Sequence, residues 1–223
     1  FAKAAHRIKQ HFRLHKGGGH SIETRGIAVR LDPVDGGLIV HANTQVPHRA
    51  RQILVEALGL SEQRIRVMAP DTGGGFGPKA AFHPEELALP AAALLLRRPL
   101  KWMEDRRENF VATVGERDQD WDMEMAVDAN GRMLALRGRL CHDHGACTPY
   151  GVALAYNAGT NVIGPYVLPA YRLDINWCLT NFGPFAPTRG AGRPQGMFVV
   201  GRLPGAAAEK TGTSRARGGR RAQ

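Results

Sequence analysis

A glycine-rich stretch constrains this chain most, because residues 73–77 read Gly-Gly-Gly-Phe-Gly between two patterned segments. Residues 64–69 have the apolar content of a strand, and residues 80–98 are rich in Ala and Leu, which favours a helix. Glycines allow positive φ and let a ligand approach the main chain closely. N–H groups at the start of a helix then point at an anionic or electron-rich group. The sequence therefore predicts a loop that contacts a ligand, in preference to a plain tight turn.

Two nucleotide-binding patterns come close to this stretch. The phosphate loop requires Gly and Lys side by side, whereas Pro78 separates Gly77 from Lys79, so that pattern fails. The dinucleotide fingerprint G-x-G-x-x-G/A does match residues 75–80. Glu104 follows the next predicted strand and is an acid of the type that binds ribose, although it lies further along than the fingerprint expects. A Rossmann-type oxidoreductase domain that binds NAD(P) or FAD is therefore one alternative.

Several short motifs occur in a fixed order and are more specific as a set than the fingerprint. Asn-Thr-Gln-Val-Pro at 43–47 and the glycine stretch are followed by His-Pro-Glu-Glu at 83–86, by the basic and acidic run at 98–108, and by Pro-Thr-Arg-Gly-Ala-Gly-Arg-Pro-Gln at 187–195. The set resembles the molybdenum-binding large subunit of the xanthine dehydrogenase and carbon monoxide dehydrogenase family. The resemblance covers residues 28–198, which are most of the chain.

The resemblance implies an α+β fold, with mixed sheets and packed helices, that forms the first part of a molybdenum hydroxylase large subunit. It implies a molybdenum-pyranopterin cofactor, with molybdopterin cytosine dinucleotide as its form. FAD and 2Fe-2S centres are implied on an FAD subunit and an iron–sulfur subunit of a hetero-oligomer. In this family the cofactor supplies the sulfurs that hold the metal, so no residue of this chain is expected as a metal ligand.

The resemblance also assigns a role to each candidate site residue. It places the Gln45 side chain beside the oxo ligand of the metal, although residue type alone favours a capping or turn glutamine. It turns Arg189 toward the substrate, where a guanidinium can bind an oxyanion or carbonyl and stabilise developing charge; an ion pair within the loop is the structural alternative. Both are candidate catalytic residues and candidate cofactor contacts. The other candidate cofactor-binding residues are Gly74, Gly75, Phe76 and Gly77.

Two departures from the family's pattern bear on the substrate. Carbon monoxide dehydrogenases have a Cys that carries copper after the loop arginine, and Gly190 stands there in this chain. Purine-oxidising members have a Glu after the loop lysine, where this chain has Ala80. The resemblance thus implies oxidation of an aldehyde or N-heteroaromatic substrate with oxygen from water. The family's catalytic base is a Glu far toward the C-terminus, so we expect this chain to be a truncated or frame-shifted product that is inactive alone.

The net charge of +10 suggests a second alternative, a non-catalytic basic binding protein. Residues 201–223 contain six basic side chains and one acidic side chain, so half of the net charge lies there. This Gly-, Ala- and Arg-rich segment has no apolar period, which predicts a disordered basic tail. Aromatic residues do not alternate with the basic ones, so no nucleic-acid partner is expected.

The cysteines Cys141, Cys147 and Cys178 have no spacing typical of a disulfide framework and indicate reduced thiols in a cytoplasmic protein. His142 and His144 lie between the first two, but the spacing does not fit a zinc pair and a strand would turn neighbouring side chains to opposite faces. No stretch approaches the ~20 apolar residues of a membrane span, so no membrane partner is expected.

The predicted organisation is a basic N-terminal segment at 1–25, a partial molybdenum-cofactor-binding domain at 26–200 and the tail at 201–223. Local signals place elements inside the middle part. We expect a hairpin of 26–31 with 38–42, a helix from Pro47 to Gly59, a strand at 99–103, a short turn or helix at 105–110, a hairpin of 119–127 with 132–140 across an Asn-Gly turn, a short helix within 148–165, a strand at 171–179 and an exposed functional loop at 181–195.

Overall fold

A computed structural model describes residues 1–147, 149–150 and 152–212 of the chain. The chain divides into two compact units, each described by itself here. Unit 2 is Gly18–Val114, and unit 1 combines Phe1–Gly17 with Gly115–Gln223. The predicted boundaries at 25 and 200 differ from this division. The N-terminal segment forms a strand of the unit 1 sheet, and the chain passes from unit 2 back to unit 1 after Val114.

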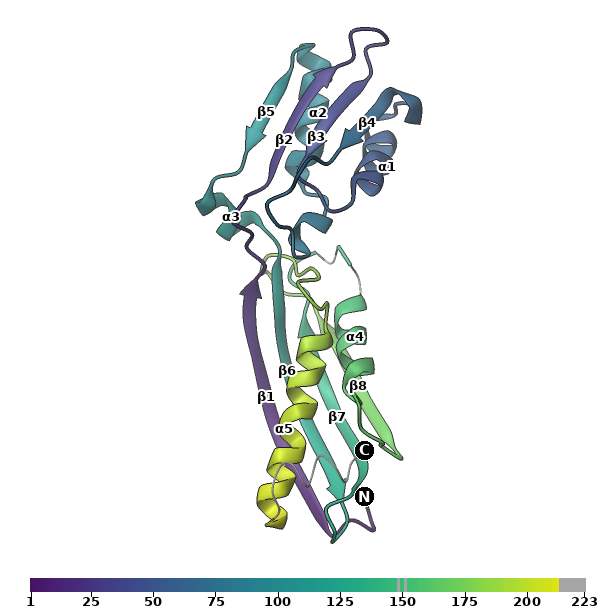
Figure 1. Ribbon diagram of the computed structural model, residues 1–223, viewed down its shortest axis with the longest axis vertical. Helices are drawn as coiled ribbons and strands as arrows, with labels where there is room; N and C mark the ends of the chain where they lie inside the picture. Colours follow the sequence, from purple (N-terminus) through teal and green to yellow (C-terminus); the bar gives the residue numbers. More distant parts are fainter. Residues whose placement is uncertain (148, 151, 213–223) are drawn as a thin grey trace. The chain divides into compact units, whose positions relative to one another are not determined.

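Unit 2 is built on a four-stranded mixed sheet with the strand order β4-β3-β2-β5 (Figure 1). β2 pairs antiparallel with both β3 and β5, whereas β3 and β4 are parallel. The turn at 32–37 joins β2 to β3, as its Asp, Pro and Gly residues predict. The strands are β2 (Gly26–Leu31), β3 (Leu38–Ala42), β4 (Ile65–Met68) and β5 (Leu100–Met103).

Of the three α-helices of unit 2, α1 begins and ends where proline and glycine predict. α1 (Pro47–Leu58) has proline in its first turn, and Gly59 caps it with φ 64° in the left-handed region. α2 (Pro84–Leu96) begins later than the expected 80, because residues 78–80 form a separate 3₁₀ turn and Pro84 starts the helix. α3 (Arg106–Ala112) is capped by Asp105, whose side chain accepts from the Glu108 N–H.

A hydrophobic core joins α1 and α2 to one sheet in unit 2. Each β-strand contributes alternate apolar residues, so one face of the sheet is apolar. Leu54 from α1 and Ala93 from α2 lie in the same cluster and are 1% and 0% exposed. The buried members are Ile27, Val29, Leu38, Val40, Ala42, Leu54, Ile65 and Ala93.

Unit 1 contains a second four-stranded sheet with the strand order β1-β6-β7-β8. β6 and β7 form the hairpin that the Asn-Gly turn predicts, with Trp121 opposite Leu140. β7 and β8 are parallel, and the connection between them contains α4 (Ala153–Asn161). The strands are β1 (His6–Gly18), β6 (Gly115–Val127), β7 (Met133–Asp143) and β8 (Tyr171–Cys178).

α5 (Arg193–Thr211) corrects the prediction of a disordered tail, since the helix continues through residues 201–211. With α4 it covers one face of the unit 1 sheet (Figure 1), where Leu203 and Ala207 join a core with Trp121 and Met125. The opposite face is charged. Residues 213–223 of the predicted tail lie outside the described residues. No helix in the described part of the chain is long and apolar enough to cross a membrane.

Candidate functional site

The glycine loop follows β4 in unit 2, as the sequence predicts, but it leads into the 3₁₀ turn Pro78–Ala80 and not directly into the predicted helix. Gly74, Phe76 and Gly77 all have positive φ, of 96°, 56° and 116°. A φ of 116° at Gly77 is a conformation that L side chains rarely adopt, so this position requires glycine. Phe76 holds a left-handed conformation at some energetic cost and is 40% exposed. The loop therefore presents main chain and one aromatic ring at the surface in a fixed, irregular geometry.

Gln45 lies against this loop, where the end of β3 leads into α1. Its Oε1 accepts a hydrogen bond from the Gly77 N–H at 2.8 Å. Because a carboxamide oxygen can accept from that N–H and its nitrogen cannot, the contact fixes which end of the amide faces the loop. The two donors of Nε2 are left for another acceptor, and the Gln45 side chain is exposed.

Glycine is required at position 75 by the nearby Gln45 side chain and not by a positive φ. A Cβ added at Gly75 would lie 2.5 Å from Gln45 Oε1 and 2.7 Å from its Cδ. The sequence indicated that glycine leaves room for a ligand, whereas the structure shows that it first leaves room for the Gln45 amide. The loop and Gln45 are thus in direct contact.

Sequence reasoning missed the partner of Lys79. The Lys79 side chain is 3% exposed, and its Nζ lies 2.8 Å from Glu23 Oε2. Glu23 stands 56 residues earlier in the chain, before β2. A cationic residue directly after a glycine loop was the one available signal, but nothing local indicates which acid would meet it.

Arg189 lies in unit 1, in a tight turn that precedes α5. The Ala191 N–H donates to the Thr188 carbonyl at 3.1 Å, which places Arg189 inside the turn. Gly190, Ala191 and Gly192 follow with φ of 102°, 48° and 96°. The Arg189 side chain is exposed. The predicted loop is irregular backbone up to Gly192, but it is not exposed throughout, since Phe185 and Ala186 are each 1% exposed, and its last predicted residues belong to α5.

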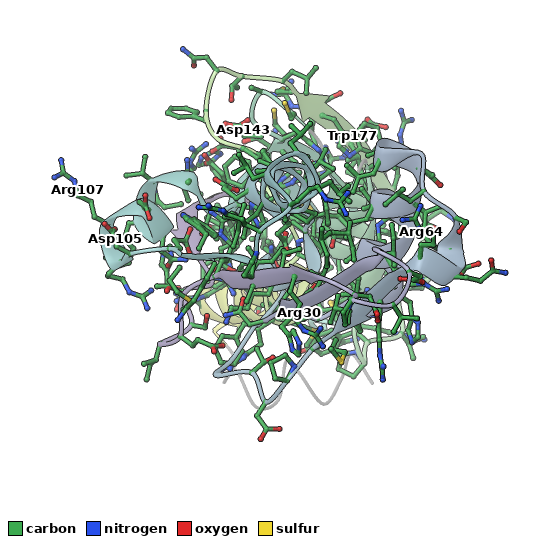
Figure 2. All side chains as sticks on the ribbon, turned by 90° about the horizontal axis from the view of Figure 1, so that it is seen from above. Arg30, Arg64, Asp105, Arg107, Asp143 and Trp177 are labelled. Atoms are coloured by element: carbon green, nitrogen blue, oxygen red, sulfur yellow. The ribbon has the colours of Figure 1, made fainter. Side chains whose placement is uncertain are left out.

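The dinucleotide-binding alternative is wrong. Residues 75–80 do not lead directly into a helix, because α2 starts only at Pro84. Glu104 is unavailable to a ribose, since its side chain is 0% exposed and pairs with Arg25 at 2.6 Å. Burial acts to raise the pKa of Glu104, but hydrogen bonds from Arg25 and Asn109 outweigh it and lower the pKa. The neighbouring side chains of Asp105 and Arg107 instead extend outward (Figure 2).

The cysteine and histidine cluster at 141–147 lies at the end of β7. Within the described ranges, no group of three or more His, Cys, Asp or Glu side chains is arranged to hold a metal ion. Cys141 Sγ lies 3.2 Å from Cys178 Sγ on β8, and burial raises the Cys141 pKa to about 11. Burial lowers the His142 pKa to about 4, so this ring is neutral at pH 7. Both groups are therefore uncharged at pH 7.

Comparison with known proteins identifies the family of this chain. The molybdopterin cofactor-binding domain family matches residues 1–219. The chain is 33% identical to the carbon monoxide dehydrogenase large chain of Hydrogenophaga pseudoflava over 186 residues, 82% of this chain and 23% of that protein. It is 32% identical to the gamma subunit of the 6-hydroxypseudooxynicotine dehydrogenase complex of Paenarthrobacter nicotinovorans over 216 residues, 96% of this chain and 27% of that protein.

Solved structures show the same fold. Quinoline 2-oxidoreductase from Pseudomonas putida 86 superposes with a TM-score of 0.94 at 33% identity, covering 99% of this chain and 28% of that chain. The chain therefore belongs to the molybdopterin cofactor-binding domain family of molybdenum hydroxylase large subunits. It spans about a quarter of the length of the curated relatives it matches.

Proposed function

We propose that this chain forms part of the cofactor site of a molybdenum hydroxylase that oxidises an aldehyde or an N-heteroaromatic compound with oxygen derived from water. The observation that carries the proposal is the hydrogen bond from the Gly77 N–H to Gln45 Oε1 at 2.8 Å. It holds an exposed amide donor beside a loop whose main chain is accessible. An enzyme that binds its metal through a cofactor needs such donors for orientation, and it needs no metal ligands from the chain.

The residues present fit the approach of a molybdenum-pyranopterin cofactor to the loop, and we propose that its form is molybdopterin cytosine dinucleotide. Gly74, Gly75 and Gly77 are only partly buried, so the main chain there is within reach of a bound group. Gln45 Nε2 would donate to an acceptor oxygen of that group, and Phe76 would offer it an apolar surface. When bound, the cofactor supplies the metal and takes up the two electrons of the oxidation; the chain's part is to bind and orient it.

Arg189 is proposed to orient the substrate and to stabilise negative charge that develops on it. A side chain at position 190 would not fit beside it, since a Cβ there would lie 2.6 Å from Pro194 Cδ and φ is 102°. This supports the proposal that carbon monoxide is not the substrate, because carbon monoxide dehydrogenases of the family have a cysteine at that position. Ala80 stands where purine-oxidising members have a glutamate, which supports the proposal that xanthine is not the substrate.

The other parts of the proposal concern the whole enzyme. We propose that electrons leave through 2Fe-2S and FAD centres on an iron–sulfur subunit and an FAD subunit, within a cytoplasmic hetero-oligomer. Two relatives are a large chain and a subunit of a dehydrogenase complex, which supports an assembly of several subunits. The chain alone is proposed to be inactive, because the base that activates water is assigned to a part of the family's large subunit outside it.

The substitution Arg189→Lys in a complete large subunit tests the substrate assignment. A point-like ammonium cannot replace a planar fork of donors, so kcat/KM should fall about 10-fold or more while the molybdenum content stays unchanged. Arg172→Lys is the matched control, because Arg172 is an exposed residue of β8 in the same unit. An unchanged kcat/KM across aldehydes and N-heteroaromatics would return Arg189 to the role of a loop ion pair.

Expression of residues 1–223 in a host that makes the cofactor tests the inactivity of the chain alone. We expect little bound molybdenum and no dye-linked oxidation of aldehydes or N-heterocycles. A molybdenum-replete and active 223-residue protein would contradict the assignment of the base to another part of the subunit.

A further inference from the structure

Lys79 places a positive charge where water hardly reaches. Its side chain is 3% exposed, whereas the Glu23 carboxylate with which it pairs at 2.8 Å is 33% exposed. A buried ammonium is costly unless a charged partner compensates it. Burial acts to raise the pKa of Glu23, but hydrogen bonds from Lys79 and from the Gly73 N–H outweigh it, so the pKa is lowered and the carboxylate is ionised at pH 7.

The same carboxylate oxygen also holds the other end of the glycine loop. The Gly73 N–H donates to Glu23 Oε2 at 2.8 Å, and the Glu23 N–H donates to the Gly73 carbonyl at 3.4 Å. The two backbones lie so close that a Cβ on Gly73 would be 2.6 Å from the Cβ of Glu23. Glu23 therefore joins Gly73 and Lys79, the two ends of the segment that contains Gly75, Phe76 and Gly77.

Lys79 connects the restrained segment to Gln45 through its backbone carbonyl. Its carbonyl accepts from the Gln45 N–H at 2.9 Å and from the Thr44 hydroxyl at 3.2 Å. Gln45 Oε1 in turn accepts from the Gly77 N–H within the restrained segment. A continuous set of contacts thus runs from the Glu23 carboxylate to both the backbone and the side chain of Gln45.

We propose that Glu23 is a positioning residue, whose carboxylate fixes residues 73–79 and, through Lys79 and Gly77, sets the direction of the Gln45 amide that receives the cofactor. The proposal rests on the proposed function for its last step only. The restraint on the loop stands on the contacts themselves.

The unequal exposure of the pair predicts unequal effects of the two single substitutions. Glu23→Gln keeps an acceptor for the Gly73 N–H but leaves the buried Lys79 ammonium without a countercharge. Lys79→Met removes the cation and leaves a carboxylate that water can reach. The first change should therefore loosen the loop more than the second, and the double variant should be closer to the wild type than Glu23→Gln alone.

The test is amide hydrogen exchange on the 223-residue chain, read at the Gly73 and Gly77 amides. We expect Glu23→Gln to raise exchange about 10-fold at these amides, with unchanged rates at Val29 and Val40 in the sheet. Lys79→Met and the double variant should raise it by no more than about threefold. The control is Glu62→Gln, which removes the same charge from an exposed ion pair. In that pair the Glu62 side chain is 65% exposed and the Arg51 side chain is 32% exposed, so the loop should be unchanged.

Loop exchange at the wild-type rate in Glu23→Gln overturns the proposal, as does faster exchange that spreads equally through the sheet or occurs in Glu62→Gln. If Glu23→Gln does not fold, the double variant decides, because it has no unpaired buried ammonium but still lacks the Glu23 carboxylate; exchange at Gly73 and Gly77 no faster than in the wild type would overturn the proposal. A complete large subunit carrying Glu23→Gln should also retain several-fold less molybdenum, and full retention overturns the link to Gln45. A wild-type subunit that takes up no molybdenum contradicts the proposed function instead and leaves the exchange result standing.

Discussion

The ion pair of Arg25 with Glu104 is the most buried charged contact of unit 2, and the substitution Glu104→Gln tests what it contributes. The two side chains are 5% and 0% exposed. Glu104 Oε1 accepts from Arg25 Nε at 2.8 Å and Nη2 at 2.6 Å, while Oε2 accepts from the Arg25 N–H at 3.0 Å and Asn109 Nδ2 at 2.7 Å. Both oxygens are therefore acceptors, and a glutamine must turn its NH₂ group toward a donor.

The expected loss of unfolding free energy in Glu104→Gln follows from the burial of the pair. Loss of one partner of a buried pair costs about 3–5 kcal/mol, because the other charge stays buried without compensation. Arg25 keeps Glu85 at 3.1 Å, a carboxylate that is 37% exposed, so the low end of that range, about 3 kcal/mol, applies. With a urea dependence of about 2 kcal/mol per molar, the unfolding midpoint of unit 2 should fall by about 1.5 M.

The assay is urea unfolding read by amide exchange and mass spectrometry, because peptides of β2 and β5 report on unit 2 and peptides of β6 and β7 on unit 1. Glu62→Gln at the exposed Arg51 pair is the control, expected to cost under about 0.5 kcal/mol. A midpoint for Glu104→Gln within about 0.3 M of that control would refute the reasoning from burial.

Two further predictions concern the segments next to the loop. Burial raises the pKa of Glu86 from 4.5 to about 7, so its contribution to stability is complete below pH 4.5 and is lost as the pH rises through 7. Glu86→Gln should match the wild type at pH 4 and be up to about 3 kcal/mol more stable at pH 8 in urea unfolding, and an equal gain from exposed Glu56→Gln would contradict this. Gly75→Ala should displace the Gln45 side chain, raising Gly77 amide exchange with under about 1 kcal/mol loss of stability; unchanged exchange would show that the Gln45 contact does not depend on glycine.

Much of the fold could be predicted because its signals are local. Pro47 and Gly59 bound α1, since proline fits the first turn of a helix and glycine takes the left-handed cap. The Asn130-Gly131 pair set the hairpin of β6 and β7 for the same kind of reason. The candidate site was also predictable, because the glycine loop and Gln45 belong to motifs that resemble a known family.

What the sequence could not predict depends on contacts between distant segments. α5 continues through Pro204 and Gly205, which read as disorder, because its small residues let it pack closely. A Cβ on Gly196 would lie 2.6 Å from the Ala158 carbonyl of α4, so the two helices approach closely there. A run of glycine and alanine shows no apolar periodicity in the sequence. Its contribution to stability comes from close packing, which exists only once the partner helix is in place.

Molybdenum content tests the central claim most directly, namely that the loop at 73–77 and Gln45 hold a molybdenum cofactor. Metal analysis would compare a complete large subunit carrying this segment with its Gly77→Val variant. Gly59→Val is the matched control, because Gly59 also has positive φ in unit 2 and has nothing within 4 Å of an added Cβ. We predict near-stoichiometric molybdenum in the wild type and the control, and loss of most of it in Gly77→Val. A wild type without molybdenum, or a folded Gly77→Val subunit with normal molybdenum content, would contradict the account.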